Sequence, residues 1–309
     1  MSNTWPDNKS FAFTIVDDTD NSTVENIAPV YALLEECGIK ITKTVWVYPP
    51  RDDFSGGSLQ DENYRKFVTE LKESGFEIAL HGVGSGSFNT EEILAGVELY
   101  KEHIREYPVI NINHSQNPDS IYWGYKRFTA PLSWLMGLIP GRRAFSGEDP
   151  VSPHFWGDWY KKNIRFTRNL VFNGINTLAA DPKMPYPVRK KDQYSNAWFS
   201  SSDAHTLKEF NRLVNPKNIQ RLKRQNGCCI VYTHFAEGFV NENGQLDPEF
   251  ENNIRSLSQQ GGWFVPAGQI LSYLASINGN GHYASYSYLV RLEMKWLLHR
   301  IVKKIKYGK

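Results

Sequence analysis

Cysteine is scarce in this sequence, and neither sign of charge dominates. The 309 residues include three cysteines, and Cys228 and Cys229 are adjacent within an apolar run. This spacing fits neither a disulfide scaffold nor a Cys-x-x-Cys zinc site, so we expect the pair to pack in a buried strand. Lysine and arginine number 35 against 33 aspartates and glutamates. The net charge of +2 provides no general field for a polyanion, and we expect no nucleic-acid partner.

Long apolar runs are also missing. The longest apolar stretch near the middle, Leu132 to Pro140, is too short to span a bilayer. The opening residues, MSNTWPDNKS, have neither the basic start nor the apolar centre of a secretory signal. These two observations predict a cytoplasmic location.

Apolar β-rich runs alternate with helical patterns along most of the chain. This repetition is typical of a parallel sheet with helices outside it, so the predicted fold class is α/β. About seven units fit a (β/α) barrel of seven or eight parallel strands. Residues from about 120 to 190 are irregular and are predicted to form an insertion on the loop face. The predicted strands lie at 11–16, 39–48, 76–82, 108–115, 196–203, 228–235 and 263–268.

The end of the chain differs from the rest. Residues 284–309 carry seven lysines or arginines and one glutamate. The segment predicts a basic amphipathic helix that follows a barrel domain of residues 1–283. Such a helix could cover the barrel base, contact a partner or lie peripherally on an anionic membrane. Its predicted apolar stripe consists of Val290, Met294, Leu297, Ile301 and Ile305.

Acidic residues and histidines stand at the ends of several predicted strands. Asp17 and Asp18 end the first strand, and His81, His114 and His234 end later ones. Strand ends converge on one face of a parallel β/α fold, so we expect these side chains to meet there. One carboxylate and two imidazoles suit a divalent metal. Such a metal would lower the pKa of water and polarise a carbonyl group.

Three short segments resemble the motifs of the polysaccharide deacetylases, the NodB-homology fold of carbohydrate esterase family four. They are TIVDDTD, ALHGVGS and VYTHF, and the closing segment GGWFVPAGQILSYLA is similar as well. The resemblance implies that Asp17 is the general base and that Asp18 and His81 bind the metal. It implies a general-acid role for His234. The expected metal is zinc, with cobalt, manganese, iron or nickel as alternatives.

The sequence departs from the family pattern in several places. The second histidine of the His-x-x-x-His motif falls on Ser85, and serine is a poor metal ligand. From its strand position, we infer that His114 supplies the missing imidazole. No Arg-x-Pro-Tyr motif follows the fourth strand. Asp20 and Ser22 are better placed than the Asp17–Asp18 pair to cap the next helix.

The predicted function is metal-dependent removal of an N- or O-acetyl group from a carbohydrate, with a carbohydrate or glycolipid as substrate. One alternative is a catalytically inactive protein of this fold that binds a glycan or a partner in surface-polysaccharide assembly, and Ser85 favours it. Another is a hydrolase of the same fold that acts on amides other than sugars.

Overall fold

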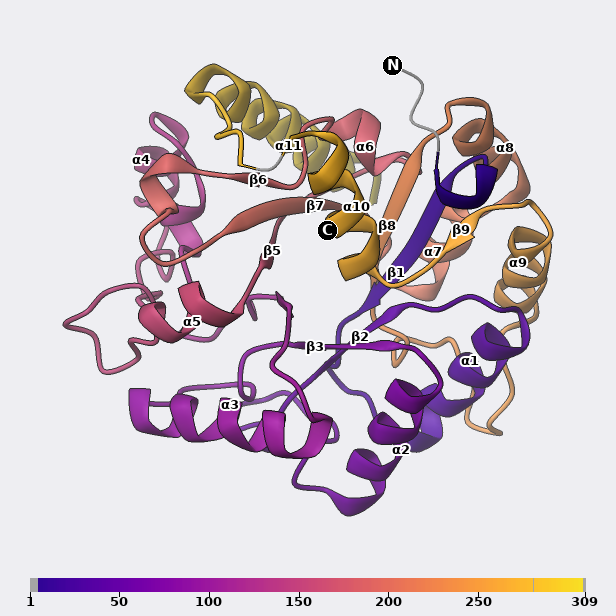
Figure 1. Cartoon of the computed structure of the whole chain (residues 1–309), viewed down its shortest axis with the longest axis horizontal. Coiled ribbons are helices and arrows are strands. Elements are labelled where there is room, and N and C mark those ends of the chain that lie inside the picture. Colours follow the sequence, from indigo (N-terminus) through magenta and orange to yellow (C-terminus); the bar gives the residue numbers. More distant parts are fainter. Residues whose placement is uncertain (1–4, 280, 308–309) are drawn as a thin grey trace.

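Seven parallel strands close into a barrel at the centre of the molecule (Figure 1). The computed structural model describes residues 5–279 and 281–307. The strand order around the barrel is β1-β2-β3-β4-β5-β7-β8, and β8 pairs with β1 to close it. The predicted (β/α) barrel is confirmed. The strands are β1 (Ala12–Asp17), β2 (Thr42–Val45), β3 (Glu77–Leu80), β4 (Ile110–Asn111), β5 (Phe166–Phe172), β7 (Ala197–Asp203) and β8 (Cys228–Thr233).

Two short strands lie outside this ring. β6 (Tyr186–Pro187) pairs antiparallel with β7. β9 (Trp263–Phe264) pairs in parallel with the first two residues of β1. β2 pairs only with the last two residues of β1, so β9 adds backbone hydrogen bonds to the half of β1 that β2 does not reach.

Helices surround the barrel (Figure 1). The helix after β1 begins at Thr23, whose side chain accepts a hydrogen bond from the backbone of Asn26 in a capping box. Asp20 therefore does not cap this helix, and its carboxylate lies at the mouth of the barrel. The helices are α1 (Val24–Glu36), α2 (Glu62–Glu73), α3 (Thr90–Ile104), α4 (Leu132–Met136), α5 (Gly157–Asn163), α6 (Thr177–Ala180), α7 (Leu207–Leu213), α8 (Pro216–Arg224), α9 (Pro248–Ser258), α10 (Ala267–Ile277) and α11 (Tyr286–Tyr307), with three 3-10 turns, η1 (Pro6–Asn8), η2 (Gly124–Arg127) and η3 (Arg189–Lys191).

Successive residues of β1 point to opposite sides of the sheet, as the geometry of a strand requires. Phe13 and Ile15 pack in the apolar cluster that includes the buried residues of α1. Val16 packs in the second cluster, with residues of β3 and β8. Asp17 therefore faces α1, where the hydroxyl of Tyr31 donates a hydrogen bond to its carboxylate. Asp18, one residue later, lines the cavity at the mouth of the barrel.

The irregular span of about 120–190 contains a barrel strand that its sequence does not reveal. β5 (Phe166–Phe172) pairs with β4 on one side and with β7 on the other. Arg168 and Asn169 interrupt its apolar pattern, and both are buried in the folded chain. Arg168 is buried because it pairs with Asp18 on the opposite side of the barrel. The irregular segment that leaves the barrel after β4 therefore ends before Phe166, where β5 begins.

The helix α11 packs against the barrel beside β5 and α6 (Figure 1). Its buried side includes Leu292, Glu293 and Trp296. Ile301 and Ile305, which the apolar stripe included, are 47% and 78% exposed. The predicted stripe is therefore not the face of α11 that packs on the barrel. The packing face includes Glu293, which is buried and accepts hydrogen bonds from Thr129, although helical periodicity assigns its position to the polar surface. Within residues 5–279 and 281–307, no helix is long and apolar enough to cross a membrane.

A buried ion pair connects β1 to β2. The ammonium group of Lys43 lies 2.9 Å from the carboxylate of Asp17, and neither side chain is exposed. In a Lys43→Met variant the carboxylate of Asp17 would be buried without its counter-ion. We expect the free energy of unfolding, measured by urea denaturation, to fall by about 3–5 kcal/mol.

The matched control is Lys66→Ala, which removes an exposed pair with Glu70. We expect that change to cost less than about 0.5 kcal/mol. A Lys43→Met variant as stable as the control would contradict the role given to this pair.

Candidate functional site

A cavity of about 390 Å³ opens where the carboxyl ends of the strands converge. Asp18 and Asp20 enter it after β1, His81 after β3, His114 after β4 and His234 after β8. These residues are far apart in the sequence and meet because the strands are parallel and share one edge. The cavity therefore collects the acidic and histidine side chains expected at the strand ends, together with Asp20.

Asp20 is the centre of this group. One of its oxygens lies 2.9 Å from Nε2 of His114. The other lies 3.2 Å from Nε2 of His81 and 3.1 Å from Nε2 of His234. Ligand atoms of Asp20, His81 and His114 all lie within 4.8 Å of one another, which is a spacing that could hold a metal ion. The sequence analysis did not assign Asp20 to the site. Its position was a signal, because a residue two places after Asp18 lies on the same side of an extended chain.

Hydrogen bonds fix the orientation of two of the imidazoles. Nδ1 of His81 lies 2.8 Å from the carbonyl oxygen of Ile112, so it must carry the ring proton. Nδ1 of His114 lies 2.9 Å from the amide oxygen of Asn117, whose own NH₂ group donates to the carbonyl of Gly84. In the neutral rings both Nε2 atoms then lack a proton, and both point at the Asp20 carboxylate.

Electron pairs on the two imidazoles and on the carboxylate of Asp20 therefore face one another. Such an arrangement needs a cation between them, either added protons or a metal ion. Two neutral imidazoles oriented through Nδ1 and one carboxylate form a donor set that zinc and similar divalent metals accept. The side chains present at this site fit a divalent cation.

Asp18 lies at the edge of the group and is bound by an arginine from across the barrel. Arg168 of β5 donates to its two oxygens at 3.1 and 2.6 Å. Burial raises the pKa of Asp18, but the Arg168 guanidinium, together with His81 and His234, outweighs burial and holds that pKa below its usual value. The carboxylate is 3.9 Å from Nε2 of His81, and it forms a second possible ligand group with Asp20 and His234. Sequence reasoning also missed Arg168, because no motif marked β5.

Asp17, the expected general base, lies outside this cavity. Its carboxylate binds Lys43 at 2.9 Å and accepts hydrogen bonds from Tyr31 and from the backbone of Phe235. The side chain is fully buried on the side of β1 that faces α1. This position supports a structural contact between β1, β2 and α1.

Ser85 and His234 complete the set of predicted residues. The hydroxyl of Ser85 donates to Asp52 at 2.7 Å, so it is engaged away from the histidines, and the imidazole beside His81 comes from His114. Nδ1 of His234 is buried and has no hydrogen-bond partner among the described residues. Because no acceptor holds a proton at Nδ1, the ring can carry its proton on Nε2, toward Asp20 and the cavity.

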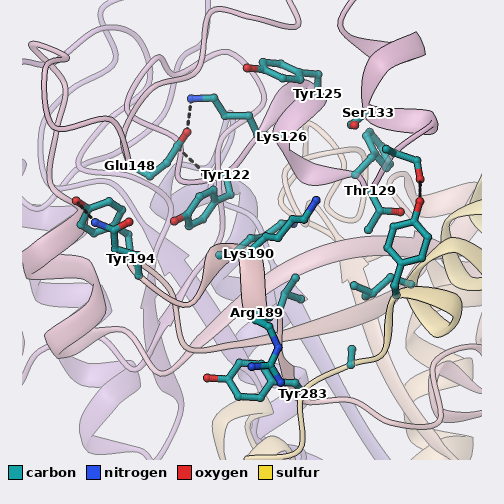
Figure 2. Close-up of a pocket in the computed structure, with 18 of the residues that line it drawn as sticks. Tyr122, Tyr125, Lys126, Thr129, Ser133, Glu148, Arg189, Lys190, Tyr194 and Tyr283 are labelled. Carbon is teal, nitrogen blue, oxygen red and sulfur yellow. Dashed lines mark hydrogen bonds and ion pairs between the residues drawn. The ribbon is translucent and has the colours of Figure 1, made fainter.

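A larger cavity of about 1030 Å³ lies between η2, η3 and the start of α11 (Figure 2). Five tyrosines contribute to its lining. Several of its charged groups have partners, since Lys126 pairs with Glu148 and Arg189 stacks over Tyr283. Among the described residues that line it there is no histidine. The candidate acid–base groups and the candidate metal ligands are therefore at the barrel mouth.

Metal binding distinguishes the roles of the two aspartates at the mouth. We expect Asp20→Asn and His81→Ala to weaken zinc binding by more than about 100-fold, because each removes a ligand. We expect Asp18→Asn to retain zinc, because Arg168 already occupies that carboxylate. The measurement is zinc content by mass spectrometry after loading and dialysis, with His103→Ala on α3 as the control. Loss of zinc in Asp18→Asn, but not in Asp20→Asn, would reverse the assignment.

Comparisons with known proteins give matches in structure only. No model of a protein family matches the sequence, and no curated protein matches it. A protein assigned as a polysaccharide deacetylase from Mycobacterium smegmatis superposes with a TM-score of 0.53 at 12% identity, over 92% of this chain and 96% of that chain. An allantoinase, Puue, gives 0.52 at 10% identity, over 88% and 92%.

A third structure, assigned as a polysaccharide deacetylase from Pseudomonas aeruginosa PAO1, gives 0.51 at 10% identity, over 88% of this chain and 93% of that chain. Identities this low establish the fold and leave the activity open. The fold that the sequence motifs implied is confirmed: this chain is a divergent example of the polysaccharide deacetylase fold.

Proposed function

We propose that this chain is a metal-dependent hydrolase that removes an N- or O-acetyl group from a carbohydrate. The observation that carries the proposal is the carboxylate of Asp20 within 3.2 Å of three imidazole nitrogens at the barrel mouth. In this proposal Asp20, His81 and His114 bind the metal. Zinc is the proposed ion because it accepts two nitrogens and one oxygen, and cobalt, manganese, iron and nickel are alternatives.

The side chains around the metal position supply acid and base. A divalent cation bound there would lower the pKa of water and polarise the acetyl carbonyl. Asp18 would accept the proton of the attacking water, and Arg168 keeps that carboxylate ionised and oriented. His234 would donate a proton to the leaving amine or alkoxide. We place Asp18, and not Asp17, in the role of base because Asp17 is paired with Lys43 outside the cavity.

The role of Asp18 can be separated from metal binding. We expect Asp18→Asn to lower kcat for acetate release from acetylated chito-oligosaccharides by about 10²–10⁴-fold, because the base is lost while the ligands stay. Acetate release by the zinc-loaded chain is measured, and zinc content is determined on the same samples. His154→Ala, on the loop before α5, is the control. Full activity in Asp18→Asn would remove this carboxylate from the mechanism.

Two alternatives from the sequence remain proposals. A protein without activity that binds a glycan is favoured if the chain carries no metal under any loading condition. A hydrolase of amides other than sugars is favoured by the similarity to an allantoinase. In that case zinc would bind as described, acetylated sugars would be inert and a cyclic amide would be hydrolysed.

We propose peripheral contact of α11 with an anionic membrane surface. Met294, Leu298, Ile301 and Ile305 follow one another at helical spacing and are between 47% and 78% exposed. Basic residues of the same helix flank them, and α4 beside it exposes Trp134 at 64%. This combination supports binding to anionic lipid. The cytoplasmic location stays a prediction.

Vesicle sedimentation tests this contact. We expect the chain to bind vesicles that contain phosphatidylserine more strongly than neutral vesicles, because cationic residues flank the apolar ones. Leu298→Glu combined with Ile301→Glu should abolish that preference. Leu94→Glu on α3, at another exposed apolar position, should keep it. Equal binding by both variants would contradict the proposal.

A further inference from the structure

The cavity at the barrel mouth is lined by more arginines than the carboxylates of the acid–base group bind. The carboxylates that line the same cavity belong to Asp18, Asp20 and Glu237, and a bound divalent metal would add positive charge to it. The arginines come from η2, from the loop after α4, from β5 and from α11. They are Arg127, Arg142, Arg168 and Arg300.

Two of these arginines have carboxylate partners. Arg168 binds Asp18, and Arg300 lies 3.6 Å from Asp203. Arg127 donates only to neutral acceptors, the side-chain and backbone oxygens of Asn169. The guanidinium of Arg142 makes no hydrogen bond or ion pair with a residue that the structure describes. Neither Arg127 nor Arg142 therefore has a carboxylate at ion-pair distance among the described residues, and the charge of Arg127 is offset only in part by the more distant Glu293.

Aromatic side chains hold Arg127 in place. Its guanidinium carbon lies 4.1 Å from the ring centre of Trp123 and 5.6 Å from that of Trp296. Burial and the neighbouring arginines, Arg142 first among them, lower the pKa of Arg127 to about 9. Like charges held together in a partly buried cavity are unfavourable, and an anionic ligand relieves that cost. The arrangement is therefore suited to binding an anion.

The same cavity also suits a sugar ring. Trp123 and Trp296 both line it, and indole rings stack on the apolar faces of sugars. Trp296 is 9% exposed, and its Nε1–H has no acceptor among the residues described. Aromatic faces and the guanidinium groups of Arg127 and Arg142 thus lie beside the metal ligands.

We infer that the substrate of this site carries a phosphoryl group on or next to the acylated sugar, and that Arg142 and Arg127 bind that group. The inference rests on the proposed function for the identity of the acyl group. A neutral glycan would leave both guanidinium groups without an ion-pair partner at contact distance. A phosphate monoester carries up to two negative charges and three acceptor oxygens, enough for two guanidinium groups, whereas a carboxylate carries one charge.

Binding of matched probes tests the inference without turnover. The probes are N-acetylglucosamine 1-phosphate, N-acetylglucosamine and inorganic phosphate, titrated by calorimetry into the zinc-loaded full chain. We expect the sugar phosphate to bind at least about tenfold more tightly than either of the other two probes. Arg142→Ala should remove about tenfold of the affinity for the sugar phosphate and leave that for N-acetylglucosamine within about twofold.

Arg143→Ala is the matched control, because Arg143 is the next residue, has the same charge and does not line the cavity. It should leave all affinities unchanged, and any phosphate that binds zinc directly affects both variants equally. Equal effects of the two variants would overturn the inference. So would binding of inorganic phosphate as tight as that of the sugar phosphate. Arg127→Lys, which keeps the charge, should lose less affinity than Arg127→Gln.

Activity separates this inference from the proposed function. If the preference that depends on Arg142 is present but no acetate is released, the deacetylase proposal fails and the anion site stands. If acetate is released from neutral and phosphorylated sugars alike, and Arg142→Ala has no effect, the inference fails and the deacetylase stands. A nucleotide-linked and a polyprenyl-diphosphate-linked N-acetyl sugar, each with two negative charges on its diphosphate, are then compared, and the one that binds more tightly identifies the carrier of the phosphoryl group.

Discussion

The alternation of side chains along the end of β1 is the constraint on which the site depends. Asp17 and Asp18 are neighbours in sequence and lie on opposite sides of the sheet. Asp17 forms a buried ion pair with Lys43, and this pair joins β1 to β2. Asp18 and Asp20 enter the same cavity, where one meets Arg168 and the other meets three imidazoles. Three carboxylates within four residues thus have three environments, and different groups balance the charge of each one.

The charges at the barrel mouth lie in two zones, a central group of carboxylates and histidines and the arginines around it. Asp20 and its histidines form a donor set that could hold a cation, and two of the arginines around it, Arg127 and Arg142, have no carboxylate at ion-pair distance among the described residues. Arg168 compensates Asp18 from across the barrel, so that carboxylate stays ionised although it is buried. The same electrostatic logic supports a metal at the centre and a negatively charged group at the rim.

The C-terminal helix α11 is part of the site as well as of the surface. Its inner face buries Leu292 and Trp296 in the second apolar cluster, and it brings Trp296 and Arg300 to the cavity. Its outer face exposes apolar residues among basic ones. A single helix therefore connects the cavity wall with the surface that we propose contacts a membrane. This would place a substrate with a lipid-linked phosphate beside both.

Local pattern in the sequence was enough to predict the barrel and the histidines at its mouth, because strand ends in a parallel fold share one edge whatever the loops do. It did not reveal β5, whose polar Arg168 is buried only because Asp18 lies opposite. Nor did it assign Asp20, since a loop carboxylate reads equally well as a helix cap until Thr23 is seen to cap the helix. Residue types and spacing thus determined the fold and most of the acidic and histidine side chains that gather at the barrel mouth. The partners of each charge were decided by tertiary structure, because they come from strands and helices distant in the chain.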